Sequence, residues 1–374
     1  MARKKRPNNT GCLRRRPNGT WEMRVTAGID DKTGRPLYRS FYARTQAEAR
    51  RKGEAFLEEL KQGRINGRDF TVAEWADRYL EHHGKVALLS PGTIDGYTYT
   101  ERLIKRVLGH LQLKELTAYE VECFLVELRN QGYSSSTITK ARGFLYGMCR
   151  AGVANKLLPH NVVADVENIR FGRKEPKECF RLDEIKTMMR DLKYDKIGLS
   201  IRLMLFTGLR KGEMLGLTKI HISEDGSIVT VTQAARRSKG KTYISDPKTP
   251  TSTRIIPVPK CAREYAILLR NCIEDGLIWS SDRCPGQPMN TKTFDQYYYE
   301  ALDSINMRRL SPHRCRHSYV SMGKAAGIPL EILRRLAGHS NGTVTEDYMH
   351  IEQSVLAREV DKIDALFAEE WVKA

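Results

Sequence analysis

The stretch from Ser311 to Tyr348 reads SPHRCRHSYVSMGKAAGIPLEILRRLAGHSNGTVTEDY, and it brings four chemically active side chains into one short region. They are His313, Arg316, His339 and Tyr348. His313 and Arg316 are three residues apart, so on a helix they lie on one face and can reach one ligand. A guanidinium matches two phosphate oxygens and stays charged, and a tyrosine beside it is a candidate nucleophile toward phosphorus. The stretch therefore predicts a site for phosphoryl transfer.

A second motif lies upstream and reads TGLRKGEMLGL from Thr207 to Leu217. Arg210 follows a tight Gly208-Leu turn that opens a helix, and Glu213 lies one helical turn further on. Taken alone, such an Arg-x-x-Glu is most often a surface ion pair. Together with the downstream stretch, the motif resembles box I of the tyrosine recombinases, and this resemblance implies that Arg210 grips the scissile phosphate and that Glu213 orients that arginine and pairs with it.

The two motifs resemble box I and box II of the tyrosine recombinases, also called phage-type integrases. A segment between them, Asp246-Pro-Lys248-Thr followed by Ser252-Thr-Arg254-Ile-Ile-Pro, resembles the β-hairpin that carries a lysine in this family. The resemblance implies that Lys248 is the general acid that protonates the departing 5′ oxygen. Lys239 and Lys241, on the preceding turn, are rivals for this role.

The resemblance also implies the remaining roles. Arg210 and Arg316 grip the scissile phosphate, and His339 donates a hydrogen bond to it. His313 binds a nonbridging oxygen or moves a proton, and Tyr348 attacks phosphorus. Arg314 is expected to support the motif or to contact DNA. Other tyrosines, Tyr297 to Tyr299 and Tyr319, lack the His-x₈-Tyr spacing of Tyr348.

Neither a metal nor another cofactor is expected. His313 and His317 share a helical face, but Cys315 points away from it and no second Cys/His pair lies nearby. The eight cysteines are scattered without a C-x-x-C pair, which is typical of reduced cytosolic thiols. No long apolar run or secretory segment occurs, so we expect a cytoplasmic protein without a membrane partner.

Charge indicates a polyanionic partner. The 374 residues include 63 Lys+Arg and 45 Asp+Glu, a formal net charge of +18. Residues 1–69 hold 18 of the basic and 8 of the acidic residues. Their pattern predicts three short strands, 12–16, 21–27 and 37–43, and a helix over 45–62.

Residues 1–69 resemble the small arm-binding domains of conjugative-transposon and some phage integrases. We expect their sheet to lie on DNA; a satellite fold with a merely solvated basic face is the alternative. The arginines expected to reach phosphates or bases are Arg14, Arg15, Arg16, Arg24, Arg35 and Arg39.

Residues 70–170 predict an all-helical unit. Capping boxes at Thr71-Val-Ala-Glu74 and Thr117-Ala-Tyr-Glu120 begin two helices, and Ser90-Pro91 and Ser134 begin two more. The unit resembles the core-binding domain of the recombinases. Basic residues expected to contact DNA here and in the following linker are Lys140, Arg142, Arg173 and Lys174.

Residues 171–374 predict a mixed, mainly helical catalytic domain with a small antiparallel sheet, whose strands are expected at 227–234, 241–245 and 254–258. The whole chain is thus expected to be α+β and multidomain. After Tyr348, apolar residues from Val355 to Phe367 recur at helical spacing. That helix either closes its own domain's core or docks on a neighbouring protomer. We expect the second arrangement, in which truncation after Glu352 leaves a folded domain.

The expected activity is site-specific recombination through a 3′-phosphotyrosine, integrating and excising a mobile element. The expected partners are double-stranded DNA with core and arm sites, three further copies in a homotetramer, and an excisionase or DNA-bending factor. A type IB topoisomerase, which nicks and rejoins without exchanging partners, is the alternative.

Overall fold

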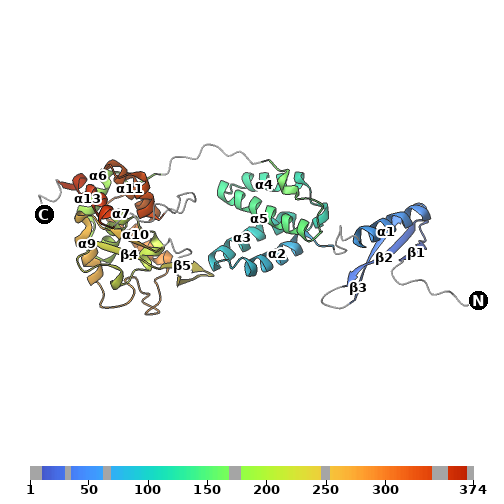
Figure 1. The fold of residues 1–374 in the computed structure, drawn as a ribbon, viewed down its shortest axis with the longest axis horizontal. Helices are drawn as coiled ribbons and strands as arrows, with labels where there is room; N and C mark the ends of the chain where they lie inside the picture. The colour runs from blue at the N-terminus through green and yellow to red at the C-terminus, as the bar shows by residue number, and fades with distance from the viewer. Residues whose placement is uncertain are drawn as a thin grey trace, which may run out of the picture. The chain divides into compact units, whose positions relative to one another are not determined.

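The computed structural model of the chain describes residues 11–29, 35–61, 69–167, 178–245, 253–338 and 353–368. Two compact units divide the chain, Met1–Lys174 and Glu175–Ala374, and Figure 1 shows the elements of each. The α+β class expected from the sequence is confirmed. Among the described residues, no helix is long and apolar enough to cross a membrane.

The first unit begins with an antiparallel sheet of β1 (Cys12–Arg15), β2 (Trp21–Ile29) and β3 (Pro36–Ala43), in that order. Helix α1 (Gln46–Lys61) packs against it (Figure 1). Alternate residues of β2, Met23, Val25 and Ala27, are buried on the helix side because side chains of a strand point to opposite faces. Among the residues described, no helix covers the other face of the sheet.

Four helices follow, α2 (Val72–Val86), α3 (Pro91–Leu108), α4 (Ala118–Asn130) and α5 (Ser135–Ala154), with short turns η1 (Leu113–Glu115) and η2 (Val162–Ala164). Both expected capping boxes are present: Thr71 and Thr117 each accept a backbone N–H, and Glu74 and Glu120 each accept one in return. Trp75 joins two helices by donating its Nε1–H to the Met148 carbonyl at 3.0 Å. These helices share one hydrophobic cluster.

The second unit is mainly helical. Its helices are α6 (Leu182–Asp191), α7 (Lys196–Thr207), α8 (Lys211–Leu215), α9 (Lys260–Asn271), α10 (Thr291–Ser304), α11 (His313–Ala325), α12 (Leu330–Ala337) and α13 (Gln353–Asp361), with turns η3 (Lys219–His221) and η6 (Lys362–Phe367). Helix α7 is buried on nearly every side, and α9, α10 and α11 pack around it. The helix is therefore the centre of this core.

The described residues of this unit also form four short strands, in two separate antiparallel pairs. Strand β4 (Ile228–Val231) pairs with β7 (Arg254–Pro257), and β5 (Ala234–Ser238) pairs with β6 (Lys241–Ser245). The single strand expected at 227–234 is wrong, since the chain leaves β4 at Thr232 and Gln233. Thr232 there bonds the ring of His221 at 2.7 Å, and Gln233 donates to the Gly216 carbonyl, also at 2.7 Å.

The C-terminal segment formed by α13 and η6 packs on its own domain. Leu356, Val360, Ile363 and Phe367 are all buried in the core of the second unit. The Phe367 ring lies edge-on to Phe206 of α7, with centroids 5.2 Å apart. The expectation that this helix docks on a neighbouring protomer is therefore wrong, because its apolar side already fills the core of its own chain.

Candidate active site and nucleic-acid surfaces

The turn that carries Arg210 is fixed by a glycine. Gly208 ends α7 in the left-handed conformation, at φ 64°, and a Cβ there would lie 2.6 Å from the Tyr319 ring. Only glycine satisfies both demands. Arg210 then caps α8: its backbone N–H donates to Glu213 Oε2 at 2.8 Å and its Nη1 to Oε1 at 2.7 Å. The predicted pairing of Arg210 with Glu213 is present.

Glu213 is a buried carboxylate shared by two arginines. Its side chain is 7% exposed, and Arg254 grips it bidentately, Nη1 to Oε1 at 3.0 Å and Nη2 to Oε2 at 2.8 Å. Burial by itself would raise the pKa of Glu213. The hydrogen bonds and charges of Arg254 and Arg210 outweigh it and lower the pKa to about 2. The carboxylate is therefore ionised across the physiological range.

Arg316 extends from α11 into the same cluster and is 1% exposed. Its Nη1 donates to the Gly208 carbonyl at 3.0 Å. Within the described part of the chain, its Nε and Nη2 have no hydrogen-bond partner. Burial, reinforced by the charge of Arg210, lowers the pKa of Arg316 to about 9. A buried guanidinium with unused donors favours an anionic ligand.

The end of α12 is held by the same arginines. Arg210 Nη2 donates to the Gly338 carbonyl at 2.8 Å, and Arg254 Nε donates to the Leu336 carbonyl at 3.1 Å. Gly338 ends the helix with a left-handed φ of 63°. His339 follows directly in the sequence, so the network reaches the residue that precedes it.

His313 is the first residue of α11 and is exposed, while Arg314 is half-buried. The His313 ring lies edge-on to that of His317, with centroids 5.0 Å apart. One helical turn separates His313 from Arg316, as the motif spacing predicts. In the described residues, no group of three or more His, Cys, Asp or Glu side chains could hold a metal ion.

Five predicted site residues lie outside the described residues: Lys248, His339, Tyr348, Arg173 and Lys174. The two rivals of Lys248 are described. Lys239 and Gly240 form the β5–β6 turn, with φ 46° at Lys239, and Lys241 begins β6. Lys248 follows β6 in the segment that leads to β7.

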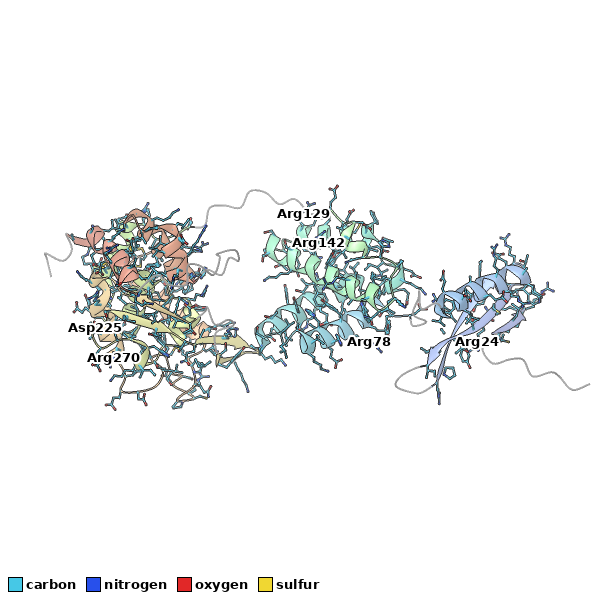
Figure 2. The ribbon with its side chains drawn as sticks, viewed as in Figure 1. Arg24, Arg78, Arg129, Arg142, Asp225 and Arg270 are labelled. Atoms are coloured by element: carbon cyan, nitrogen blue, oxygen red, sulfur yellow. The ribbon has the colours of Figure 1, made fainter. Side chains whose placement is uncertain are left out.

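On the N-terminal sheet, three of the six predicted arginines share the face opposite α1. Arg14 Nε donates to Glu22 at 2.7 Å, and the guanidiniums of Arg24 and Arg16 lie over the rings of Tyr38 and Tyr42, at 4.1 and 5.3 Å. Figure 2 marks Arg24 on this sheet. Hydrogen bonds from Arg14 and Ser40 lower the pKa of Glu22 to about 2. The face therefore combines cations with half-exposed aromatic rings.

The other arginines of this group lie elsewhere. Arg35 is exposed just before β3, and Arg15 pairs in register with Trp21 on the helix side. Arg39 is half-buried on the α1 side of the sheet: its guanidinium lies 4.9 Å from the Phe56 ring centroid, and it pairs with Asp69 at 3.6 Å. Alternation along β3 turns Arg39 toward α1, away from the face shared by Arg14, Arg16 and Arg24, which disfavours the predicted DNA contact.

Arg142 of α5 also has an internal role. Its Nη2 donates to the Val163 and Val166 carbonyls, at 3.4 and 2.9 Å, and so holds η2 against the helix. Figure 2 labels Arg142 among these helices. These bonds give Arg142 a structural role, and its contact with DNA stays a prediction. Lys140, two residues earlier, is exposed.

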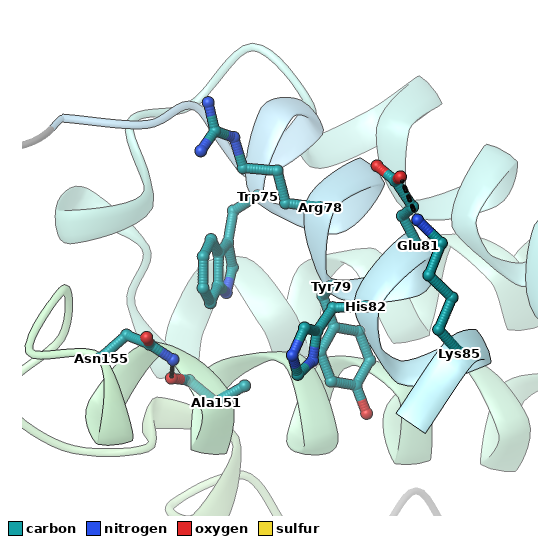
Figure 3. A pocket seen from close by; sticks show the side chains of 8 residues that line it. All are labelled: Trp75, Arg78, Tyr79, Glu81, His82, Lys85, Ala151 and Asn155. Carbon is teal, nitrogen blue, oxygen red and sulfur yellow. Dashed lines mark hydrogen bonds and ion pairs between the residues drawn. The ribbon is translucent and has the colours of Figure 1, made fainter. Parts of the chain in front are cut away.

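A pocket of about 390 Å³ lies between α2 and α5 (Figure 3). It is lined by Trp75, Arg78, Tyr79, Glu81, His82, Lys85, Ala151 and Asn155. Glu81 and Lys85 pair at 2.8 Å on its rim. None of the predicted catalytic or DNA-contacting residues that the structure describes lines this pocket.

Comparison with known proteins identifies the second unit. Residues 178–354 match the model of the phage integrase family. This region is a tyrosine recombinase domain. The chain is 25% identical to a XerC-like tyrosine recombinase of Caldanaerobacter subterraneus subsp. tengcongensis, over 94% of this chain and 97% of that protein. An integrase of Streptomyces ambofaciens is also 25% identical, over 87% of this chain and 88% of that protein.

Solved structures of integrases share the fold of this recombinase. The Tn1549 transposon integrase in complex with a circular intermediate DNA superposes with a TM-score of 0.63 at 18% identity, covering 82% of this chain and all of that one. A lambda integrase tetramer bound to a Holliday junction superposes with a TM-score of 0.56 at 20% identity, covering 93% of this chain and 99% of that one. At the level of the fold, the likeness to transposon integrases expected from the sequence is confirmed.

One residue of the recombinase site was missed by sequence reasoning. Arg254 stands in the Ser252-Thr-Arg254-Ile-Ile-Pro segment, where only the neighbouring lysine attracted a role. The sequence could have indicated this residue. If Glu213 is buried and Arg210 must stay free to bind phosphate, the carboxylate needs a second cation to compensate its charge. Strand β7 supplies that cation.

Proposed function

We propose that this recombinase is a site-specific integrase that cuts and rejoins double-stranded DNA through Tyr348, integrating and excising a mobile element. The observation that carries the proposal is the burial of Arg316 with unpaired hydrogen-bond donors. Arg316 is buried beside Arg210 with two donor groups unused in the described structure. Leaving such donors unpaired costs about 1–3 kcal/mol each. A phosphate that binds there supplies both missing acceptors.

The reaction balances with the residues of the motif. The Tyr348 oxygen forms a bond to phosphorus, and the bond from phosphorus to the 5′ oxygen breaks. The proton that the phenol loses passes to His313 or solvent, and Lys248 gives a proton to the departing 5′ oxygen. The product is a 3′-phosphotyrosine, and the 5′ hydroxyl of the partner duplex reverses the step and joins the strands.

The charge of the described cluster suits this reaction. Three guanidiniums, those of Arg210, Arg254 and Arg316, surround one carboxylate, Glu213. The excess of positive charge favours the state in which negative charge builds up on the nonbridging oxygens. His339 adds a further donor in this proposal. In other phosphoryl transfers a metal ion performs this task.

Two surfaces of the first unit support DNA as the substrate. The open face of the β1–β3 sheet offers Arg14, Arg16 and Arg24 beside two tyrosines. Helix α5 contains no acidic residue, and Lys140, Tyr146 and Arg150 are exposed along one of its sides. Gly143 lies between them, with no atom within 4 Å of where its Cβ would be. A phosphate backbone can therefore approach that side closely.

We propose that four copies assemble on two duplexes, as the lambda integrase tetramer does on a Holliday junction. The alternative, a type IB topoisomerase, uses the same covalent chemistry without exchanging partners. The integrase names of two relatives favour recombination. Joining of strands between two labelled duplexes separates the two activities, because a topoisomerase reseals only the duplex that it cut.

The test uses a nicked suicide duplex, selected from a randomised pool by covalent capture on the wild-type chain. Tyr348→Phe is expected to bind this duplex with unchanged affinity and to form no covalent adduct. Tyr319→Phe is the matched control: it also removes one hydroxyl, and it is expected to keep the adduct because Tyr319 is buried. An adduct that survives in Tyr348→Phe contradicts the proposal.

A further inference from the structure

Arg254 occupies an unusual place in the recombinase site. It is the first residue of β7, and its side chain is only 9% exposed, against 42% for Arg210. All three of its nitrogens are used: two on Glu213 and one on the Leu336 carbonyl. A side chain so enclosed and so fully bonded is unsuited to grip DNA itself.

The hydrogen bonds of Arg254 connect two parts of the site. One part is the Glu213 carboxylate, which also accepts the backbone N–H and Nη1 of Arg210. The other is the end of α12, where a Cβ on Gly338 would lie 3.2 Å from Arg254 Nη1. The helix end thus rests directly on the guanidinium.

We propose that Arg254 is a positioning residue for catalysis, which keeps Arg210 aimed at the phosphate and fixes the helix end that leads into His339. This role rests on the function proposed above. Arg254 touches neither DNA nor the reacting atoms; it acts through Glu213 and the α12 carbonyl.

The electrostatic reason lies in Glu213. A buried carboxylate needs compensation, and with Arg254 removed Arg210 is its only remaining hydrogen-bonded cation among the described residues. Arg210 Nη1 and Nη2 now point in different directions, to Glu213 and to the Gly338 carbonyl. Without Arg254, Arg210 is drawn into a closer pairing with Glu213. The phosphate then loses a precisely placed donor, although the Arg210 side chain is still present.

The alternative hypothesis, that Arg254 has a purely structural role, predicts a different outcome. If Arg254 only stabilises the fold, its loss lowers the melting temperature and slows the reaction equally whether or not Arg210 is present. If it positions Arg210, its effect on the reaction depends on Arg210. A double-mutant cycle measures that dependence.

The experiment measures the single-turnover rate of adduct formation on the captured suicide duplex, at saturating protein. The full-length variants are Arg254→Gln, Arg210→Ala and the double substitution. Arg254→Gln is expected to slow the step roughly 10–100-fold, the usual range for residues that orient a site's contact groups. In the Arg210→Ala background the further loss is expected to shrink to less than about 3-fold, with unchanged affinity for the duplex.

Arg202→Gln is the matched control. Arg202 is fully buried and holds the carbonyls of Met189, Leu192 and Lys193, away from Glu213. It is expected to lower the melting temperature and to leave the rate nearly unchanged below the transition. If Arg254→Gln does not fold, Arg254→Lys, which keeps the charge and loses the bidentate fork, enters the same cycle.

Equal losses from the Arg254 substitution in both backgrounds overturn the positioning role, as does an equal slowing by Arg202→Gln. If the wild-type chain captures no duplex, the proposed function falls, and the positioning role falls with it. An adduct on the wild type together with additive losses overturns only the positioning role.

Discussion

Removal of the C-terminal segment is expected to unfold the catalytic unit, because that segment completes its core. Truncation after Glu352 takes away the side chains of Leu356, Val360, Ile363 and Phe367, each at most 2% exposed. Full burial of one such side chain stabilises by about 1.5–3 kcal/mol, so the four together contribute about 6–12 kcal/mol. That equals the whole stability of a typical domain, roughly 5–15 kcal/mol.

The truncation also uncaps a helix. Asp364 accepts the backbone N–H of Cys261 at 2.9 Å at the start of α9, and a lost cap costs a further 0.5–2 kcal/mol or so. A milder change, Phe367→Ala, is expected to cost about 3–5 kcal/mol, since it also leaves a cavity against Phe206. Leu366→Ala is the control on the same turn, and its half-buried side chain predicts a smaller loss.

Amide hydrogen exchange in the truncated chain and in the two point variants is the suitable assay, because it reports each unit separately. Loss of protection is expected in α7 and α9, while α2 to α5 of the first unit keep theirs. A truncated chain in which α7 and α9 stay as protected as in the wild type refutes the reasoning. That result means that the segment docks on a neighbouring copy.

Two further predictions concern the first unit. Burial, together with the hydrogen bond to Asp77, raises the pKa of Glu101 to about 7, so the folded chain holds this proton more tightly than the unfolded chain. The free energy of unfolding of α2 and α3 is therefore expected to fall as pH rises from about 4.5 to 7. Glu101→Gln is expected to raise the urea midpoint at pH 8 but not at pH 4. Equal shifts at both pH values contradict the raised pKa of Glu101. On the sheet, Arg24→Ala is expected to reduce the slope of log affinity against log salt by about 0.9, the share of one phosphate, whereas Arg39→Ala leaves the slope unchanged. Fluorescence anisotropy on DNA over a salt series measures both, and equal slopes for the two variants contradict the division of the two faces.

Local patterns in the sequence predicted much of this molecule. The capping boxes at Thr71 and Thr117 mark helix starts because their hydrogen bonds join residues only three positions apart. The Arg210–Glu213 pair is local in the same way. The resemblance of the two motifs to a family supplied the rest of the expected chemistry.

Long-range partners could not be predicted in this way. Arg39, Arg142 and Arg24 are equally basic in sequence, yet the first two bond within the protein, and only the third lies on the open sheet face. Arg254 meets a carboxylate 41 positions away. The apolar side of the last helix predicts burial but says nothing about which chain provides the partner surface.

The most direct test of the central claim is to locate the covalent bond between protein and DNA. The adduct formed by the wild-type chain on the suicide duplex is digested with protease and nuclease, and the peptide that carries the nucleotide is sequenced by mass spectrometry. The expected result is a 3′-phosphate linked to Tyr348, with a free 5′ hydroxyl on the departing strand. A nucleotide on Tyr297, Tyr298 or Tyr299, or a linkage through a 5′-phosphate, contradicts the account.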